Sequence, residues 1–382
     1  MKKIFIIIML FIGSSLYAEI ILGAKNSEAY LPQLKGKRVA LVVNYASQVN
    51  GVHLVDQLLE QQINVVKIFA PEHGFRGKAD AGEQIKDGKD KATGLPIVSL
   101  YGKHKKPTRA DLKNVDIIVF DIQDVGVRFY TYLSTLHYVM ESAAQNALPI
   151  IVLDRPNPNG ARIDGEILNF NYTSFVGMHP VPILYGLTIG EYAMMINGEG
   201  WLKGNLLANL TVVPLQNYTH NTPYSLPIKP SPNLPNDLSI YLYPSLALFE
   251  GTTFSVGRGT NKQFQLYGNP LYQPKRFVFT PVSKEGAKYP KHENKRCYGV
   301  DLGAILVDEY SGIDLGYIID AYRNYPHKTK FFLKNRFFDK LAGSNSLRTQ
   351  IQAGLSEEQI KKSWEKNLND FRTIRQKYLQ YP

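Results

Sequence analysis

Short apolar runs, separated by segments with helical spacing, fill the first half of the chain and constrain its fold more than any other feature. They span residues 38–44, 64–70, 97–101, 115–121 and 149–154. The first reads RVALVVN and has no polar residue between its ends, which is typical of a strand buried on both faces. Because these strands alternate with helices, we predict an α/β fold: a Rossmann-like, largely parallel sheet with helices on both faces.

The second half of the chain is less regular. Prolines at 227, 230, 232 and 235 exclude regular helix or central strand and predict an irregular segment that crosses the molecule. Near the C-terminus, Ser356 and Gln359 form a capping box ahead of a long amphipathic helix. Its expected buried stripe consists of Ile360, Trp364, Leu368, Phe371, Ile374 and Tyr378.

A chain of 382 residues is long enough for two domains. We predict a catalytic domain at 19–270 and a smaller α+β auxiliary domain at 271–382. Residues 1–18 have the pattern of a signal peptide, in which Lys2 and Lys3 precede an apolar stretch and Ala18 fits the cleavage point. That stretch is shorter than the roughly 20 residues that span a bilayer, and no cysteine follows it directly. We expect a periplasmic or secreted protein without a stable membrane anchor, and the sequence leaves the oligomeric state unknown.

Charge and motif content exclude several function classes. The chain has 44 Lys and Arg against 33 Asp and Glu, a formal net charge of +11. A basic exported protein can meet nucleic acid, an anionic envelope or an acidic substrate, but no nucleic-acid motif is present and we expect no such partner. The single cysteine, Cys297, allows neither an internal disulfide nor a zinc pattern. No GxGxxG, Walker loop, HExxH or GxSxG occurs, so we expect no cofactor.

Polar clusters follow directly after the predicted strands. PEHGFRG at 71–77 leads to AGE at 81–83, Tyr101 ends the third run, and DIQDVGVR at 121–128 and DRPNPNG at 154–160 follow the last two. The carboxyl ends of parallel strands lie along one edge of a sheet, where ligands bind. The sequence therefore predicts a functional site at that edge.

Glu72 is the first choice for proton transfer in this site. It follows an apolar strand in a loop framed by proline and glycine, and a carboxyl group withdrawn from water can act as a general acid. Alternatively, Glu72 caps a turn or pairs with Arg76. Glu83 is either a second carboxylate or a solvated loop charge. His73 either orients Glu72, binds substrate or makes a structural hydrogen bond.

The later clusters supply binding residues. Asp121 and Asp124 could hold a magnesium or calcium ion, but we favour a site without metal, with the aspartates holding loop amides. Gln123 and Asn157 offer amides to sugar hydroxyls. Three loop arginines could each bind a ligand carboxylate through two hydrogen bonds. Alternatively, each of them is solvated or forms a structural ion pair. They are Arg128, Arg155 and Arg258.

These clusters resemble a bacterial family of exo-acting β-N-acetylmuramidases known as NamZ. Besides the motifs above, the similarity includes TGLPIVSLYG at 93–102, FDIQDVGVRFYTY at 120–132, SPNLP at 231–235 and LFEGTTFSVGRGT at 248–260. The resemblance implies a Rossmann-like catalytic domain with a C-terminal auxiliary domain. It also implies release of terminal N-acetylmuramic acid from the non-reducing end of peptidoglycan glycans.

The resemblance implies that Glu72 is the catalytic acid and that a tyrosine takes part, for which we choose Tyr101 over Tyr130 and Tyr132. Glycoside cleavage needs an acid together with a base or nucleophile. Besides a tyrosine, that partner could be Glu83, Asp121 or Asp124. Muramic acid carries a lactyl carboxylate, and we predict that Arg128 or Arg155 contacts it.

Two alternatives compete with this hypothesis. An exported protein with a tyrosine-lined cleft could bind a sugar or muropeptide without turnover. A metal-dependent esterase or amidase acting on wall peptides would instead use Asp121, Asp124 and His73. Aglycone release from a muramic acid glycoside separates the enzyme from the binding module, and full activity after chelation argues against the metal enzyme.

Overall fold

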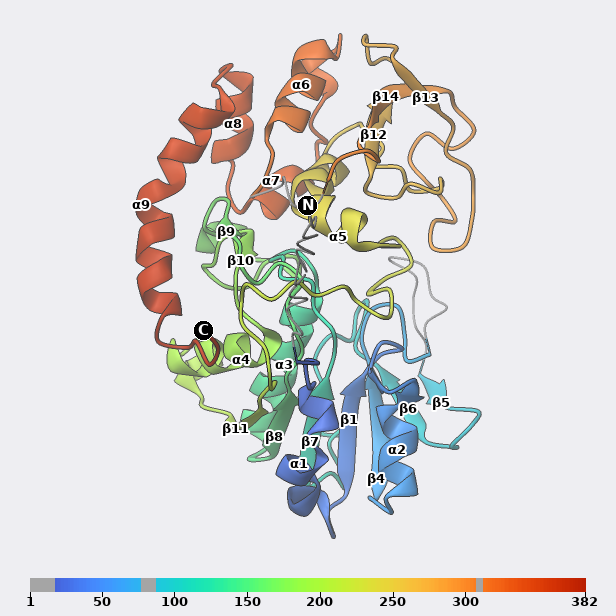
Figure 1. Ribbon diagram of the computed structural model, residues 1–382, viewed down its shortest axis with the longest axis vertical. Helices are drawn as coiled ribbons and strands as arrows, with labels where there is room; N and C mark the ends of the chain where they lie inside the picture. The colour runs from blue at the N-terminus through green and yellow to red at the C-terminus, as the bar shows by residue number, and fades with distance from the viewer. Residues whose placement is uncertain (1–17, 77–86, 307–311) are drawn as a thin grey trace, which may run out of the picture.

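A seven-stranded sheet forms the base of the molecule in the computed structural model, which describes residues 18–76, 87–306 and 312–382 (Figure 1). The strand order is β11-β8-β7-β1-β4-β6-β5, and every neighbouring pair is parallel except β5 with β6. The strands are β1 Val39–Val43, β4 Val65–Ala70, β5 Gly88–Lys89, β6 Pro96–Ser99, β7 Ile117–Asp121, β8 Pro149–Leu153 and β11 Asn209–Val213. All five apolar runs are strands of this sheet, as predicted.

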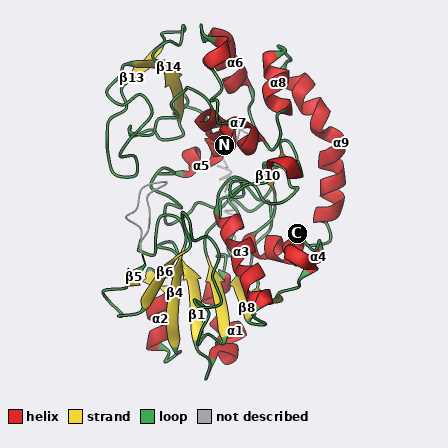
Figure 2. Ribbon diagram, turned by 180° about the vertical axis from the view of Figure 1, so that it is seen from behind, coloured by secondary structure: helices red, strands yellow, loops and turns green. Residues whose placement is uncertain are grey.

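Both faces of the sheet are buried, which explains why its strands are continuously apolar. In β1, Val39 and Leu41 pack into one hydrophobic cluster, and Ala40 and Val42 into another on the opposite face. Figures 1 and 2 show α1 and α2 on one face and α3 and α4 on the other. These helices are α1 Ser27–Leu34, α2 Leu54–Glu60, α3 Tyr132–Gln145 and α4 Ile189–Gly198. The Rossmann-like arrangement is confirmed.

The upper part of the molecule in Figure 1 is a smaller α+β unit, also as predicted. Its three-stranded sheet is antiparallel, with the order β12-β14-β13. The elements are β12 Leu266–Asn269, β13 Phe277–Phe279, β14 Cys297–Asp301, α5 Asp237–Leu246, α6 Gly316–Asn324, α7 Phe337–Ala342 and α8 Ser346–Gln352. Two short pairs complete the strands: β2 Gln48–Val49 with β3 Val52–His53, and β9 Ile163–Asp164 with β10 Leu184–Tyr185.

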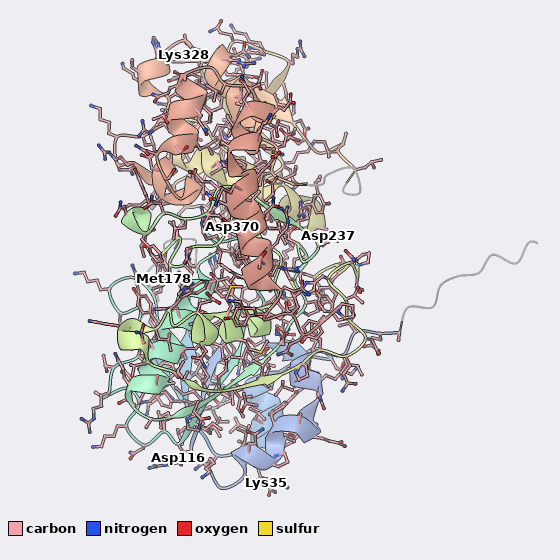
Figure 3. All side chains as sticks on the ribbon, turned by 90° about the vertical axis from the view of Figure 1, so that its left-hand side faces the viewer. Lys35, Asp116, Met178, Asp237, Lys328 and Asp370 are labelled. Atoms are coloured by element: carbon pink, nitrogen blue, oxygen red, sulfur yellow. The ribbon has the colours of Figure 1, made fainter. Side chains whose placement is uncertain are left out.

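The last helix, α9 Glu357–Arg375, joins the two units (Figure 3). Its N-terminus has the predicted capping box of Ser356 and Gln359, and its buried residues are Ile360, Trp364, Leu368 and Phe371. The last two residues of the predicted stripe are wrong, because Ile374 is only partly buried and Tyr378 lies beyond the end of the helix. Beyond the helix, the Tyr381 hydroxyl donates to Asp154 Oδ2 at 2.7 Å. The end of the chain is therefore tied to the carboxyl end of β8.

The proline-rich crossing segment, residues 217–236, runs between the two units. Two tyrosine hydroxyls hold it by its backbone: Tyr45 donates to the carbonyl of Lys229, and Tyr130 to that of Pro230 at 2.6 Å. Across the described parts of the chain, none of the helices combines the length and apolar character that crossing a bilayer requires.

Candidate active site

A cavity of about 300 Å³ opens where the strand-end loops of the large sheet meet the smaller unit. Glu72 and Tyr101 line it from loops after β4 and β6, and Tyr130, Thr131 and Tyr132 line it from the start of α3. Other parts of the lining come from residues 175–176, the crossing segment, α5, residues 250–264 and α7. Loops after two strands of the large sheet therefore contribute to one cavity, together with the start of α3.

A tight turn presents Glu72 to this cavity. β4 ends at Ala70, and the Gly74 amide donates to the Pro71 carbonyl at 3.0 Å. His73 and Gly74 both adopt left-handed backbone, with φ of 70° and 78°, which reverses the chain immediately after Glu72. The Thr131 hydroxyl then donates to Glu72 Oε2 at 2.7 Å. The half-buried carboxylate is therefore held from α3 and from its own loop.

Arg76, the alternative partner for Glu72, binds other carboxylates. Its Nη2 lies 2.9 Å from Asp90 Oδ2 and 3.3 Å from Asp56 Oδ1. Hydrogen bonds from this guanidinium lower the pKa of Asp90 to about 2. The arginine that could have neutralised Glu72 thus holds the edge of the sheet together.

Tyr101 is the tyrosine whose phenol feels the charge of the Glu72 carboxylate across the cavity lining that the two residues share. Burial, followed by the charge of Glu72, raises the pKa of Tyr101, so its phenol stays protonated at neutral pH. Tyr130 and Tyr132 also line the cavity, but Tyr130 donates to the Pro230 carbonyl and Tyr132 accepts from Asn44 Nδ2 at 2.9 Å.

Glu250 and Arg258 form an ion pair in the cavity wall. Arg258 Nε donates to Glu250 Oε1 at 2.7 Å, and the guanidinium carbon lies 5.0 Å from the centre of the Phe264 ring. Glu72 and Glu250 are the only carboxylates among the described residues that line the cavity. Sequence reasoning missed Glu250, although it lies in the LFEGTTFSVGRGT motif eight positions before Arg258.

Asp121 and Arg155 are not brought to the cavity. They are completely or almost completely buried and form a two-pronged pair, with Arg155 Nη2 2.9 Å from Asp121 Oδ2. This contact occupies the carboxylate that a metal ion would need. Among the described residues, no group of three or more His, Cys, Asp and Glu side chains could hold a metal ion. Neither the metal alternative nor a substrate contact of Arg155 gains support.

Gln123, Asp124 and Asn157 also lie outside the cavity lining, in the packing beneath it. Gln123 Nε2 donates to the carbonyls of Asp124 and Pro156, and Asn157 Nδ2 donates to that of Leu187 at 2.8 Å. Asp124 Oδ2 accepts from the Gly126 amide at 2.7 Å and from the Tyr185 hydroxyl. Burial raises the pKa of Asp124 to about 7. These side chains hold loops, as expected for the aspartate but not for the two amides.

Arg128 joins the two units instead of facing a ligand. Its Nη1 donates to the carbonyls of Glu166 and Val181, and its Nη2 to those of Leu341 and Ala342 at 2.9 and 2.7 Å. The last two are carbonyls at the end of α7. With only 1% of its surface exposed, Arg128 is a structural clamp, and the predicted contact with a substrate carboxylate gains no support.

Of the other predicted residues, His73 and Arg258 line the cavity, and Glu83 lies outside the described residues. The structure therefore brings together Glu72, His73, Tyr101 and Arg258.

Comparison with known proteins assigns the chain to a family. Residues 39–238 match the family model "Exo-beta-N-acetylmuramidase NamZ, N-terminal", and residues 241–381 match its C-terminal counterpart. The chain belongs to the NamZ family. The junction of the two NamZ models lies just inside α5, about thirty residues before the boundary at 270 that we predict from the sequence.

Relatives agree with this assignment along most of the chain. The peptidoglycan β-N-acetylmuramidase NamZ of Bacillus subtilis is 42% identical, over 92% of this chain and 89% of that protein. Two crystal structures of DUF1343 family proteins from Bacteroides fragilis share the fold, with TM-scores of 0.89 and 0.84 at 46% and 31% identity. Each covers 95% of this chain and 99% of its own.

Proposed function

We propose that this chain is an exo-acting glycoside hydrolase that releases terminal N-acetylmuramic acid from the non-reducing end of peptidoglycan fragments. Membership of the NamZ family, with a curated muramidase 42% identical along most of the chain, supports this activity. The observation that carries the chemistry is the half-buried Glu72 carboxylate in a cavity of about 300 Å³, beside Tyr101 and Thr131.

In this proposal Glu72 is the general acid that protonates the departing glycosidic oxygen. Cleavage of a glycosidic bond requires a proton for the leaving oxygen as the anomeric carbon gains positive charge. The hydrogen bond from Thr131 fixes the direction of the Glu72 carboxyl group. Preorganised geometry of this kind makes proton transfer efficient.

Glu250 is our choice for the second catalytic group, which acts on the anomeric carbon or activates water. Tyr101, our first choice from the sequence, has a raised pKa and is therefore a poor nucleophile when its phenol is protonated. Glu250 is instead a carboxylate in the cavity wall, and it is oriented by its pair with Arg258. If this is right, azide restores turnover to Glu250→Ala but not to Tyr101→Phe. Azide rescue of neither variant, together with greater activity loss in Tyr101→Phe, would return the role to Tyr101.

Arg258 takes over the part that we predicted for Arg128 or Arg155. It is the arginine among the described residues that line the cavity, and it is therefore placed to contact the lactyl carboxylate of muramic acid. Its side chain is already oriented by Glu250 and by the face of Phe264.

The test is aglycone release from a chromogenic β-glycoside of N-acetylmuramic acid. Wild-type protein should release the aglycone with or without a chelator, and Glu72→Gln should not. Saturable binding of the glycoside without release would favour the binding-module alternative. Loss of activity on chelation would favour the metal-dependent alternative.

Export is part of the proposal. Lys2 and Lys3, the apolar stretch and Ala18 support a cleaved signal peptide and a periplasmic or secreted location. N-terminal sequencing of protein recovered outside the cytoplasm should begin close after Ala18. An unprocessed N-terminus in the cytoplasmic fraction would contradict this.

A further inference from the structure

A second, more open pocket of about 490 Å³ shares a lining residue with the cavity. Ser231 lines both, and the residues that follow it divide between them: Asn233 and Leu234 face the cavity, whereas Pro232 and Pro235 face this outer pocket. The crossing segment therefore lines both the cavity and the outer pocket.

The opposite wall divides in the same way. In the loop before β12, Arg258 and Phe264 line the cavity, whereas Asn261 and Gln263 line the outer pocket. Because two chain segments each contribute to both spaces, the two spaces are neighbours, an inner cavity and an outer pocket.

The two spaces differ in charge and exposure. The inner cavity is lined by two carboxylates, Glu72 and Glu250, by Arg258 and His73, and by several aromatic rings. The outer pocket is lined by Lys229 and Lys284 against the single carboxylate of Glu285. Lys229 is exposed, while Lys284 Nζ is partly engaged, donating to Asn261 Oδ1 at 2.6 Å.

Hydrogen bonds from two tyrosines fix the part of the crossing segment that lines the outer pocket. Tyr45 lines it, and the Tyr45 hydroxyl donates to the carbonyl of Lys229. The next carbonyl, that of Pro230, accepts from Tyr130 of the inner cavity. Two tyrosines therefore fix adjacent residues, which sets the position of Lys229 relative to the site of cleavage.

We propose that the outer pocket binds the departing part of the glycan and that Lys229 and Lys284 recognise the carboxylate carried by its next muramic acid residue. This inference rests on the proposed function and extends it to substrate selection. An exo-acting enzyme holds one terminal sugar in the inner cavity, so the rest of the glycan must extend beyond it, and the outer pocket is the more open space next to it. The tyrosine ring and the amides of Asn261 and Gln263 suit a saccharide.

The test compares three substrates: the chromogenic muramic acid glycoside, a muramic acid–glucosamine disaccharide, and the tetrasaccharide that repeats this unit. Lys229→Gln should lower kcat/KM for the tetrasaccharide about threefold and leave the two shorter substrates within twofold, since a partly exposed ion pair contributes modestly. The double variant with Lys284→Gln should lose more. Lys35→Gln, at the far end of the molecule in Figure 3, is the matched control and should change nothing.

Two further substrates identify the recognised group. A tetrasaccharide whose second lactyl carboxylate is converted to its methyl amide should behave in the wild type as the unmodified one does in Lys229→Gln. A tetrasaccharide with a peptide on that lactyl group moves the carboxylate, and retention of the lysine effect there assigns recognition to the peptide.

The outcomes separate the two proposals. If the wild type fails to hydrolyse the chromogenic glycoside, the proposed function is wrong. If it hydrolyses all substrates but Lys229→Gln and the double variant lower kcat/KM equally for each, or for none, the outer pocket does not bind the departing glycan.

Discussion

Two polar regions lie at the same edge of the large sheet, and they differ in how their charges are satisfied. Around Asp121 and Arg155, each charged group meets a buried partner of the same protein. Around Glu72 and Glu250, the carboxylates are held from one side and face a cavity on the other. Asp121 and Glu72 both lie at the end of a strand of the large sheet, but of the two only Glu72 faces the cavity.

This difference explains why residues from adjacent motifs have unlike roles. Buried polar groups must find hydrogen-bond partners, and a parallel sheet has many loop ends to hold in place. Asp121, Asp124 and Arg128 meet that need with their own chain. Glu72 and Glu250 differ from these residues, because their hydrogen-bond partners leave one side of each carboxylate facing the cavity.

Glu72→Gln tests the open region and should have the largest effect. The amide keeps the size of the side chain but cannot donate the catalytic proton, so kcat should fall by about 10²–10⁴-fold. The melting temperature should change little, because the substitution buries no new charge. Activity and thermal unfolding are measured on the same preparation. An active variant, or an unfolded one, would remove the distinction between the regions.

Asp121→Ala tests the closed region and should act in the opposite way. It leaves the Arg155 guanidinium buried without its carboxylate, which costs about 3–5 kcal/mol in the free energy of unfolding. Denaturant unfolding measures this cost, and kcat of the folded fraction should stay close to that of the wild type.

The double variant Asp121→Ala with Arg155→Met is the control, since it removes the stranded charge and should recover part of the stability. A stable single variant with lost activity would instead place Asp121 in catalysis.

The sheet could be predicted from the sequence because burial on both faces leaves a direct trace in the residues. Val39 to Val43 are apolar without a break for that reason. The same applies to α9, whose capping box and buried stripe both depend on residues close together in the sequence. Patterns of residues close together in the sequence were therefore enough to predict the sheet and α9.

The site could be predicted only in part, because hydrogen-bond partners that are distant in the sequence produce no recognisable sequence pattern. Arg128 looks like a ligand-binding arginine until the carbonyls of Leu341 and Ala342 appear beside it, and backbone acceptors have no sequence signature. Glu250 lies in a short 3-10 helix, Ala247–Gly251, beyond the part of the sequence in which strand and helix patterns alternate. A glutamate and an arginine inside one motif were the signal that could have indicated the pair.

Arg258→Lys sharpens the comparison within the open region. Lysine keeps a positive charge near Glu250 but loses the planar two-pronged geometry that suits a carboxylate. We expect kcat/KM for a muramic acid glycoside to fall about ten- to a hundredfold, while that for the glucosamine analogue, which lacks the lactyl group, falls less. The measurement is the ratio of the two values. Arg372→Lys, on the exposed side of α9, is the control. An unchanged ratio would mean that Arg258 does not contact the lactyl carboxylate.

Asp124→Asn probes the closed region through the pH dependence of its stability. Burial raises the pKa of Asp124 from 3.8 to about 7 in the folded protein, so folding favours the protonated carboxyl group. Its contribution to stability is complete below about pH 4 and is lost as the pH rises through about 7. The wild type should therefore lose up to about 1.4 kcal/mol per pH unit relative to the variant across this window. The asparagine oxygen can still accept from the Gly126 amide and the Tyr185 hydroxyl, so the fold should persist. Parallel pH dependences of unfolding for the two proteins would show that Asp124 is ionised in the fold and that this region is less closed than its hydrogen bonds indicate.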